Sequence, residues 1–215
     1  MILASFETLL DVTPPSFARK FEVAVLMGAF AEAFDVEPPA VGDLTADEAL
    51  RAFREFTAAC MEAALADEAT ARKYRARLRE VALRLGSQVR SMLRPRAASV
   101  FRLTQALYRG IGIELRGDSQ SCVAPYFPGA LEFGPCSFAQ RYTSADCWFM
   151  SAFDEGFMCG IAGVDAQLSF SCRLTEGATC CRACFREGRT EGEVSSLPAA
   201  CCESPGGDAR QLGFA

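Results

Sequence analysis

The chain has 215 residues, half of them hydrophobic, and a formal net charge of -5 at pH 7. This length is enough for one large domain with a full hydrophobic core. The acidic balance argues against a nucleic-acid-binding protein, whose phosphate contacts need a basic surface. The absence of histidine excludes Ser-His-Asp and Cys-His catalysis within one chain.

Helical patterns fill residues 1–109, which we predict to form a helical region. Prolines and capping residues divide this region into helices. The sequence Thr45-Ala-Asp-Glu48 has the form of a capping box, in which the two side chains bond reciprocally to backbone N–H groups. The predicted helices cover about residues 2–11, 16–34, 45–66, 67–93 and 97–108.

Residues 110–187 change in character and predict a cysteine-rich region of mixed structure. The last part alternates apolar and polar residues from Gln167 to Leu174, turns at Glu176-Gly177, and continues through Cys180–Phe185. This pattern indicates a β-hairpin. The segments before it are predicted as a strand at 111–115, a loop at 117–128, a turn at 134–136, and a helix that begins at Ser137 or Thr143 and holds Asp146 and Asp154.

The Gly-, Ser-, Glu- and Pro-rich residues 188–215 predict a flexible tail. The expected fold class is therefore α+β: a helical N-terminal half packed on a small antiparallel β-sheet, with one or two further helices. No run of about 18 uncharged apolar residues occurs, so no membrane partner is expected. The first residues, MILASFETLLD, lack a basic segment, and we predict a cytoplasmic protein.

Ten of the 11 cysteines fall between Cys122 and Cys202. In a reducing compartment they are expected to be thiols, metal ligands or catalytic groups rather than disulfides. Cys122 lies on the predicted loop after a strand, beside Tyr126, where a thiol can be exposed and activated. A buried structural cysteine is the simpler interpretation.

Asp146 lies on a mainly apolar segment, ADCWFM. A carboxyl group in such surroundings can be a desolvated general base. An acid in the first turn of a helix, where the helix dipole favours it, explains the residue equally well.

Cys180, Cys181 and Cys184 offer an alternative metal site, since Cys181 and Cys184 form a CxxC motif. Zinc would need four thiolates here, for example with Cys201 and Cys202, and paired thiols can also take soft metal ions. Neighbours in a strand point to opposite faces, so Cys180 and Cys181 share a site only if the strand is bulged.

Residues 100–185 resemble the L-2-amino-thiazoline-4-carboxylic acid hydrolase-like family. The resemblance depends on the order and spacing of a few motifs, of which the last is the most specific. Thr143 stands where the family usually has a cysteine, and Arg182 where it often has an acid. The matched positions are Tyr108 in LYRGIGIEL, Cys122 with Pro125 and Tyr126, Asp146, and Leu174-Thr-Glu-Gly177 with Cys180 and Cys181.

This resemblance implies a hydrolase that opens a small sulfur-containing cyclic amidine by C–N bond hydrolysis, with no required cofactor. Cys122 or Cys181 is then the expected nucleophile and Asp146 the acid or base. Substrate-binding roles are expected for Tyr126, Glu176 and Arg182. The alternatives are a soft-metal-handling or organomercurial-lyase-like protein, and a non-catalytic module that binds a small molecule.

Overall fold

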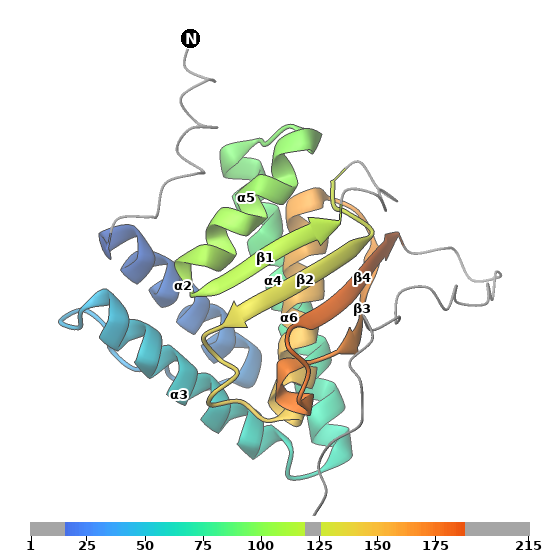
Figure 1. Cartoon of the computed structure of the whole chain (residues 1–215). Helices are drawn as coiled ribbons and strands as arrows, with labels where there is room; N and C mark the ends of the chain where they lie inside the picture. The colour runs from blue at the N-terminus through green and yellow to red at the C-terminus, as the bar shows by residue number, and fades with distance from the viewer. Residues whose placement is uncertain (1–15, 119–125, 188–215) are drawn as a thin grey trace, which may run out of the picture.

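The computed structural model describes residues 16–118 and 126–187. Within them the chain forms five α-helices and one four-stranded antiparallel sheet (Figure 1), which confirms the predicted α+β class. The elements are α2 (Ser16–Phe34), α3 (Ala46–Ala64), α4 (Glu68–Leu93), α5 (Ala97–Gly110), β1 (Ile113–Asp118), β2 (Ala130–Cys136), α6 (Ser144–Ala162), β3 (Ala166–Cys172), the 3-10 helix η1 (Leu174–Glu176) and β4 (Cys181–Glu187). The helix predicted at 2–11, the loop residue Cys122 and the tail at 188–215 lie outside the described residues.

Capping side chains set the starts of α3 and α4 where the sequence predicts them. The Glu48 carboxylate accepts a hydrogen bond from the Thr45 N–H at 2.8 Å, and the Thr45 hydroxyl accepts one from the Glu48 N–H at 3.3 Å. This is a complete capping box. Asp67 caps α4 by accepting a hydrogen bond from the Thr70 N–H at 2.9 Å.

Among the described residues, 16–118 and 126–187, no helix is both long and apolar enough to cross a membrane.

The sheet has the strand order β1-β2-β4-β3. The predicted hairpin is confirmed as the antiparallel pair of β3 and β4, with Leu168 opposite Phe185. Strand β2 was not predicted, because Gly134-Pro135-Cys136 indicated a turn. These residues instead end β2, beyond Phe133, which is the last β2 residue paired with β4. Proline lacks the N–H that a central ladder needs, but it is tolerated at such a position.

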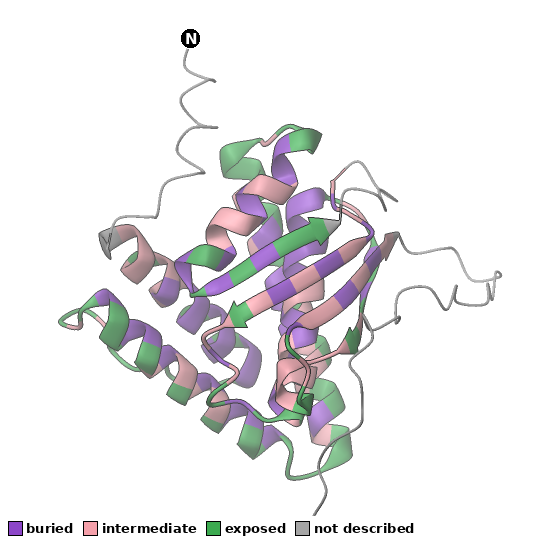
Figure 2. Cartoon of the chain, viewed as in Figure 1, coloured by how far each residue is buried: buried purple, intermediate pink, exposed green. Residues whose placement is uncertain are grey.

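The described helices all lie on one face of the sheet (Figure 1). Helix α6 packs on β3 and on α4, and α2 packs on α3 and α4. Along β3 buried and exposed residues alternate: Ala166 and Leu168 are buried, whereas Gln167, Ser169 and Ser171 are exposed. A similar alternation can be followed along β2 in Figure 2. We call the face toward α6 the inner face and the opposite one the outer face.

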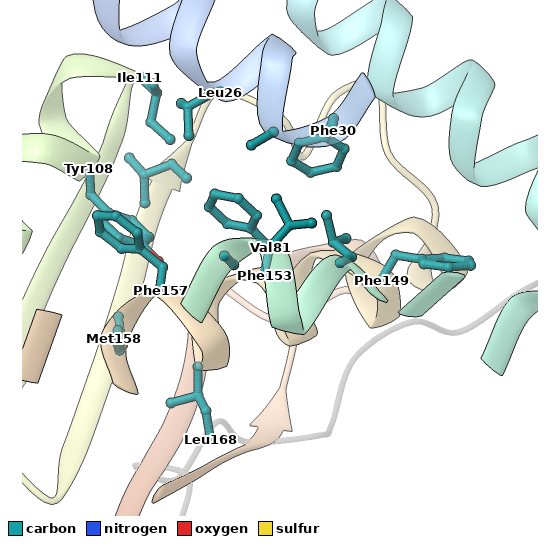
Figure 3. Close-up of a cluster of buried hydrophobic side chains, with 14 of the residues drawn as sticks. Leu26, Phe30, Val81, Tyr108, Ile111, Phe149, Phe153, Phe157, Met158 and Leu168 are labelled. Atoms are coloured by element: carbon teal, nitrogen blue, oxygen red, sulfur yellow. The ribbon is translucent and has the colours of Figure 1, made fainter. Parts of the chain in front are cut away.

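Glycines allow α4 and α6 to approach each other closely. A Cβ added at Gly156 would collide with the Arg79 carbonyl oxygen, and one added at Gly160 with that of Leu83. Around this helix pair the core is strongly aromatic (Figure 3): the ring centroid of Phe30 lies 5.3 Å from that of Phe153. Core residues come from both the helical region and the cysteine-rich region, so α6 joins the two.

Candidate functional site

A cavity of about 60 Å³ lies between α6 and the inner face of the sheet. Its wall is mainly apolar and includes Ile113 of β1, Phe133 of β2, Met150 of α6 and Phe170 of β3. Six groups with reactive or ionisable side chains also line it, and all of them lie in the cysteine-rich half of the chain. They are Cys136, Tyr142, Cys147, Asp154, Arg173 and Cys181.

The secondary structure explains why these side chains converge. On α6, Cys147, Met150 and Asp154 follow an i, i+3, i+7 spacing and therefore share one face of the helix. On β4, Cys181 alternates in phase with the buried residues Ala183 and Phe185, which places its side chain on the inner face. Phe133 lies opposite Cys181 in the β2–β4 ladder.

The three thiols of the cavity are held in their neutral form. Burial raises the pKa of Cys136 to about 11. It also raises the pKa of Cys147 and of Cys181. The Cys181 sulfur accepts a hydrogen bond from the Leu174 N–H at 3.3 Å, which opposes this effect without overcoming it. Because the thiolate is the nucleophilic form, these cysteines are weakly reactive near neutral pH.

Asp154, in the middle of α6, is the carboxyl group that lines this cavity among the described residues. The Tyr108 hydroxyl donates a hydrogen bond to its Oδ1 at 2.7 Å. Burial raises the pKa of Asp154 to about 7, and the Tyr108 bond only partly offsets that rise. A carboxyl group with such a pKa can exchange a proton near neutral pH, which is the range that acid–base chemistry and pH sensing require.

Asp154 also borders a second cavity of about 40 Å³, on the side of α2 and α5. Glu22 and Tyr108 line this second cavity, and Ile113 and Met150 border both cavities. Burial raises the pKa of Glu22 to about 8, against the opposing charge of Arg19. Two carboxyl groups that favour the protonated form therefore line one cavity.

Arg173 supplies the only guanidinium group on the wall of the first cavity, as far as the described residues show. Its Nη1 donates to Glu176 Oε1 at 3.1 Å, and its guanidinium carbon lies 5.2 Å from the centroid of the Phe170 ring. Its Nε is buried and has no hydrogen-bond partner within the described part of the chain. An unsatisfied buried donor on a cationic group is energetically unfavourable, and binding sites are common places to find one.

Of the predicted catalytic residues, Cys181 lines the cavity and Asp146 does not. Asp146 belongs to the capping box of α6: its Oδ2 accepts from the Thr143 N–H at 2.8 Å and from the Thr143 hydroxyl at 2.9 Å. The physical reason is the Thr143 N-cap, which makes Asp146 the third residue of the helix. Cys122 lies outside the described residues.

The predicted substrate-binding residues also lie away from the cavity wall. Arg182 follows Cys181 on β4 and therefore points to the outer face, where its Nε lies 3.8 Å from Glu132 Oε2. Glu176 contributes only through its ion pair with Arg173. Tyr126 is partly buried and packs against the core beside the segment that is not described.

The alternative metal site conflicts with the geometry of β4. Cys181 and Cys184 are three residues apart in one strand, so they face opposite sides of the sheet and cannot bind one ion together. Within the described residues, 16–118 and 126–187, no group of three or more Cys, Asp or Glu side chains is placed to hold a metal ion. Cys201 and Cys202 lie outside these ranges.

Comparison of the chain with protein-family models, curated proteins and solved structures finds no match. The resemblance to the amino-thiazoline hydrolases therefore remains a prediction from motifs.

Proposed function

We propose that this protein binds a small, mostly apolar molecule in the cavity between α6 and the sheet. One observation carries the proposal: an apolar wall and a few polar groups, Asp154, Arg173 and the thiols, line a single partly open cavity. This combination is typical of small-molecule sites. It corresponds to the non-catalytic binding module among the alternatives considered from the sequence.

The size of the cavity limits the ligand. A cavity of about 150 Å³ lined by aliphatic and aromatic side chains can hold benzene. The cavity of about 60 Å³ therefore suits only a few non-hydrogen atoms. A larger ligand would have to extend past the rim or displace a side chain.

The state of the thiols favours binding over covalent catalysis. A thiolate nucleophile at neutral pH needs a lowered pKa, and burial raises the pKa of Cys136, Cys147 and Cys181 instead. No histidine is present to deprotonate them. Neutral thiols behave as small, polarisable apolar groups that suit an uncharged part of a ligand.

Methyl NMR tests the proposal directly. Compounds of four to seven non-hydrogen atoms would be titrated while the methyl signals of Ile113 and Met150 are followed, since both side chains line the cavity. Met61, fully buried in α3, is the internal control. We expect at least one compound to shift the first two signals and leave Met61 unchanged. If no compound does so, the cavity does not bind small molecules.

A cavity-filling variant supplies the matched control. Cys181→Leu replaces the sulfur with three carbon atoms, a net gain of two non-hydrogen atoms inside the cavity, and is expected to abolish the shifts. Cys184→Leu makes the same change on the outer face of the same strand and is expected to preserve them. Equal binding by both variants would place the ligand elsewhere.

Hydrolysis is the second candidate, supported by the fact that a thiol, Cys181, and a carboxyl group with a pKa of about 7, Asp154, line one cavity. In this version the Cys181 thiol adds to the amidine carbon while the Asp154 carboxylate takes its proton. Asp154 then gives that proton to the leaving nitrogen as the C–N bond breaks, and water hydrolyses the covalent intermediate and restores the thiol. Turnover of 2-aminothiazoline-4-carboxylate would be measured in the parent protein and in Cys181→Ser and Asp154→Asn. Activity that survives both changes would exclude this mechanism.

A further inference from the structure

Arg173 lies on the wall of the cavity and carries one cationic donor that has no partner among the described residues. The Nε atom is buried and unpartnered among the described residues, while Nη1 is occupied by Glu176. Within the fold, the guanidinium is held in place by this ion pair and by the ring of Phe170. The Arg173 side chain is 20% exposed, so most of it is covered by the fold.

The charge of Arg173 acts inside the cavity. Burial is the main influence on the pKa of Cys147 and of Cys181 and raises both, while the positive charge of Arg173 opposes the rise at each. A ligand atom placed among these thiols would therefore also experience the positive charge. The rest of the wall includes Ile113, Phe133 and Met150, and no described residue adds a second cation to it.

We infer that the ligand is a short-chain monocarboxylate, with its carboxylate on Arg173 and its hydrocarbon chain among Ile113, Phe133 and Met150. This inference rests on the proposed binding function and adds the chemical class of the ligand. An arginine N–H donates to a carboxylate in a planar, charge-assisted hydrogen bond, which would satisfy the orphaned Nε.

The remaining groups of the cavity restrict the ligand to one charge. A second carboxylate would have to lie beside Asp154 or among neutral thiols, where no cation balances it. A phosphate dianion carries two negative charges, whereas Arg173 supplies one positive charge to the cavity. The volume of about 60 Å³ is well below the roughly 150 Å³ that holds benzene, so it takes about two to three carbon atoms of the chain beyond the carboxylate.

Calorimetric titration with butyrate and with butyramide, which has nearly the same shape but no charge, tests the inference in the unmodified protein. Because hydrogen bonds to charged groups are strong, butyrate is expected to bind at least about tenfold more tightly than butyramide. Acetate and octanoate are expected to bind more weakly than butyrate, the first because it fills too little of the cavity and the second because it is too long.

Variants of two arginines test whether Arg173 causes the preference for butyrate over butyramide. Arg173→Gln is expected to remove the preference for butyrate and to leave the affinity for butyramide within about threefold. Arg182→Gln is the matched control, because Arg182 lies on the outer face of the sheet and pairs with Glu132 there. It is expected to retain the full preference.

The outcomes separate the two proposals. If butyramide binds as tightly as butyrate and shifts the Met150 methyl signal, the carboxylate inference fails and the binding function stands. A preference for butyrate that survives in Arg173→Gln overturns the role of Arg173. If neither compound binds and no small fragment shifts the Ile113 and Met150 signals, both proposals fail. The comparison of butyrate with butyramide uses the unmodified protein, so it tests the inference even if Arg173→Gln does not fold.

Discussion

The two sides of α6 are packed in opposite ways. Toward α4, Gly156 and Gly160 leave no room for even one methyl group before the backbone of the other helix. Toward the sheet, Cys147 and Asp154 border a cavity of about 60 Å³. Protein interiors are normally close-packed, so the cavity is a feature of the sheet side of α6 and not of the α4 side. The helix pair thus forms a rigid support, and the sheet side offers space for a ligand.

The largest expected change in stability comes from a substitution at the close contact between α4 and α6. Gly160→Ala places a Cβ against the Leu83 carbonyl oxygen, and the helices have to separate to accommodate it. We expect a loss of about 2–3 kcal/mol in the free energy of unfolding, as is typical of overpacked sites. Urea denaturation monitored by circular dichroism measures the change.

Gly28→Ala is the matched control, because Gly28 lies in α2 with no heavy atom within 4 Å of an added Cβ. Here the same substitution is expected to stabilise the protein by about 0.5–1 kcal/mol, since alanine is the better helix former. Effects of the same sign at both positions would contradict the close α4–α6 contact.

The next effect concerns the acids at the two cavities. Burial raises the pKa of Asp154 to about 7 and that of Glu22 to about 8, whereas carboxyl groups in an unfolded chain titrate near 4. The folded protein therefore binds these protons more tightly, and their contribution to stability falls as the pH rises from about 4 to about 8. Each group is expected to account for at least about 1 kcal/mol of that fall.

Asp154→Asn tests this pH dependence because it removes one of the two titrations. As the pH rises from 5 to 8, the unfolding free energy of the parent should fall more than that of Asp154→Asn. Asp43→Asn, at an exposed position before α3, is the control. A parent–variant difference that stays constant with pH would show that Asp154 does not titrate in this range.

The chemistry of the cavity thiols provides a further test, which does not involve the stability of the fold. With the pKa of Cys136 at about 11, its thiolate fraction at pH 7.5 is several hundredfold lower than that of a free cysteine, whose pKa is about 8.5. Alkylation by iodoacetamide, mapped by peptide mass spectrometry, should be correspondingly slow at Cys136 and faster at pH 9.5. Rapid labelling of Cys136 at pH 7.5 would contradict its burial.

Much of the fold follows from local sequence signals. Thr45, Glu48 and Asp67 specify helix starts through bonds within a few residues, and the alternation after Gln167 specifies a strand through its period of two. Strand β2 escaped prediction because its end, Gly134-Pro135, resembles a turn when its neighbours β1 and β4 are unknown. Such pairings are long-range and leave no local signal.

The candidate site was only partly predictable for the same reason. Cys181 was recognised from a motif, and the spacing of Cys147, Met150 and Asp154 on one helix face was available as a signal. Nothing near Arg173 in the sequence indicates a donor without a partner, because that depends on which atoms surround it in the fold. Asp146 fitted two roles in the sequence, and only the hydrogen bonds of Thr143 distinguish them.

The smallest expected effect separates these two roles of Asp146. If Asp146 acts only in the capping box, Asp146→Ala lowers the free energy of unfolding by about 1 kcal/mol and leaves binding of butyrate unchanged. Glu48→Ala, in the equivalent position of the capping box of α3, should lower it by a similar amount. Urea denaturation and calorimetric titration of the same samples measure both quantities. A loss of affinity in Asp146→Ala, with none in Glu48→Ala, would instead connect Asp146 to the ligand.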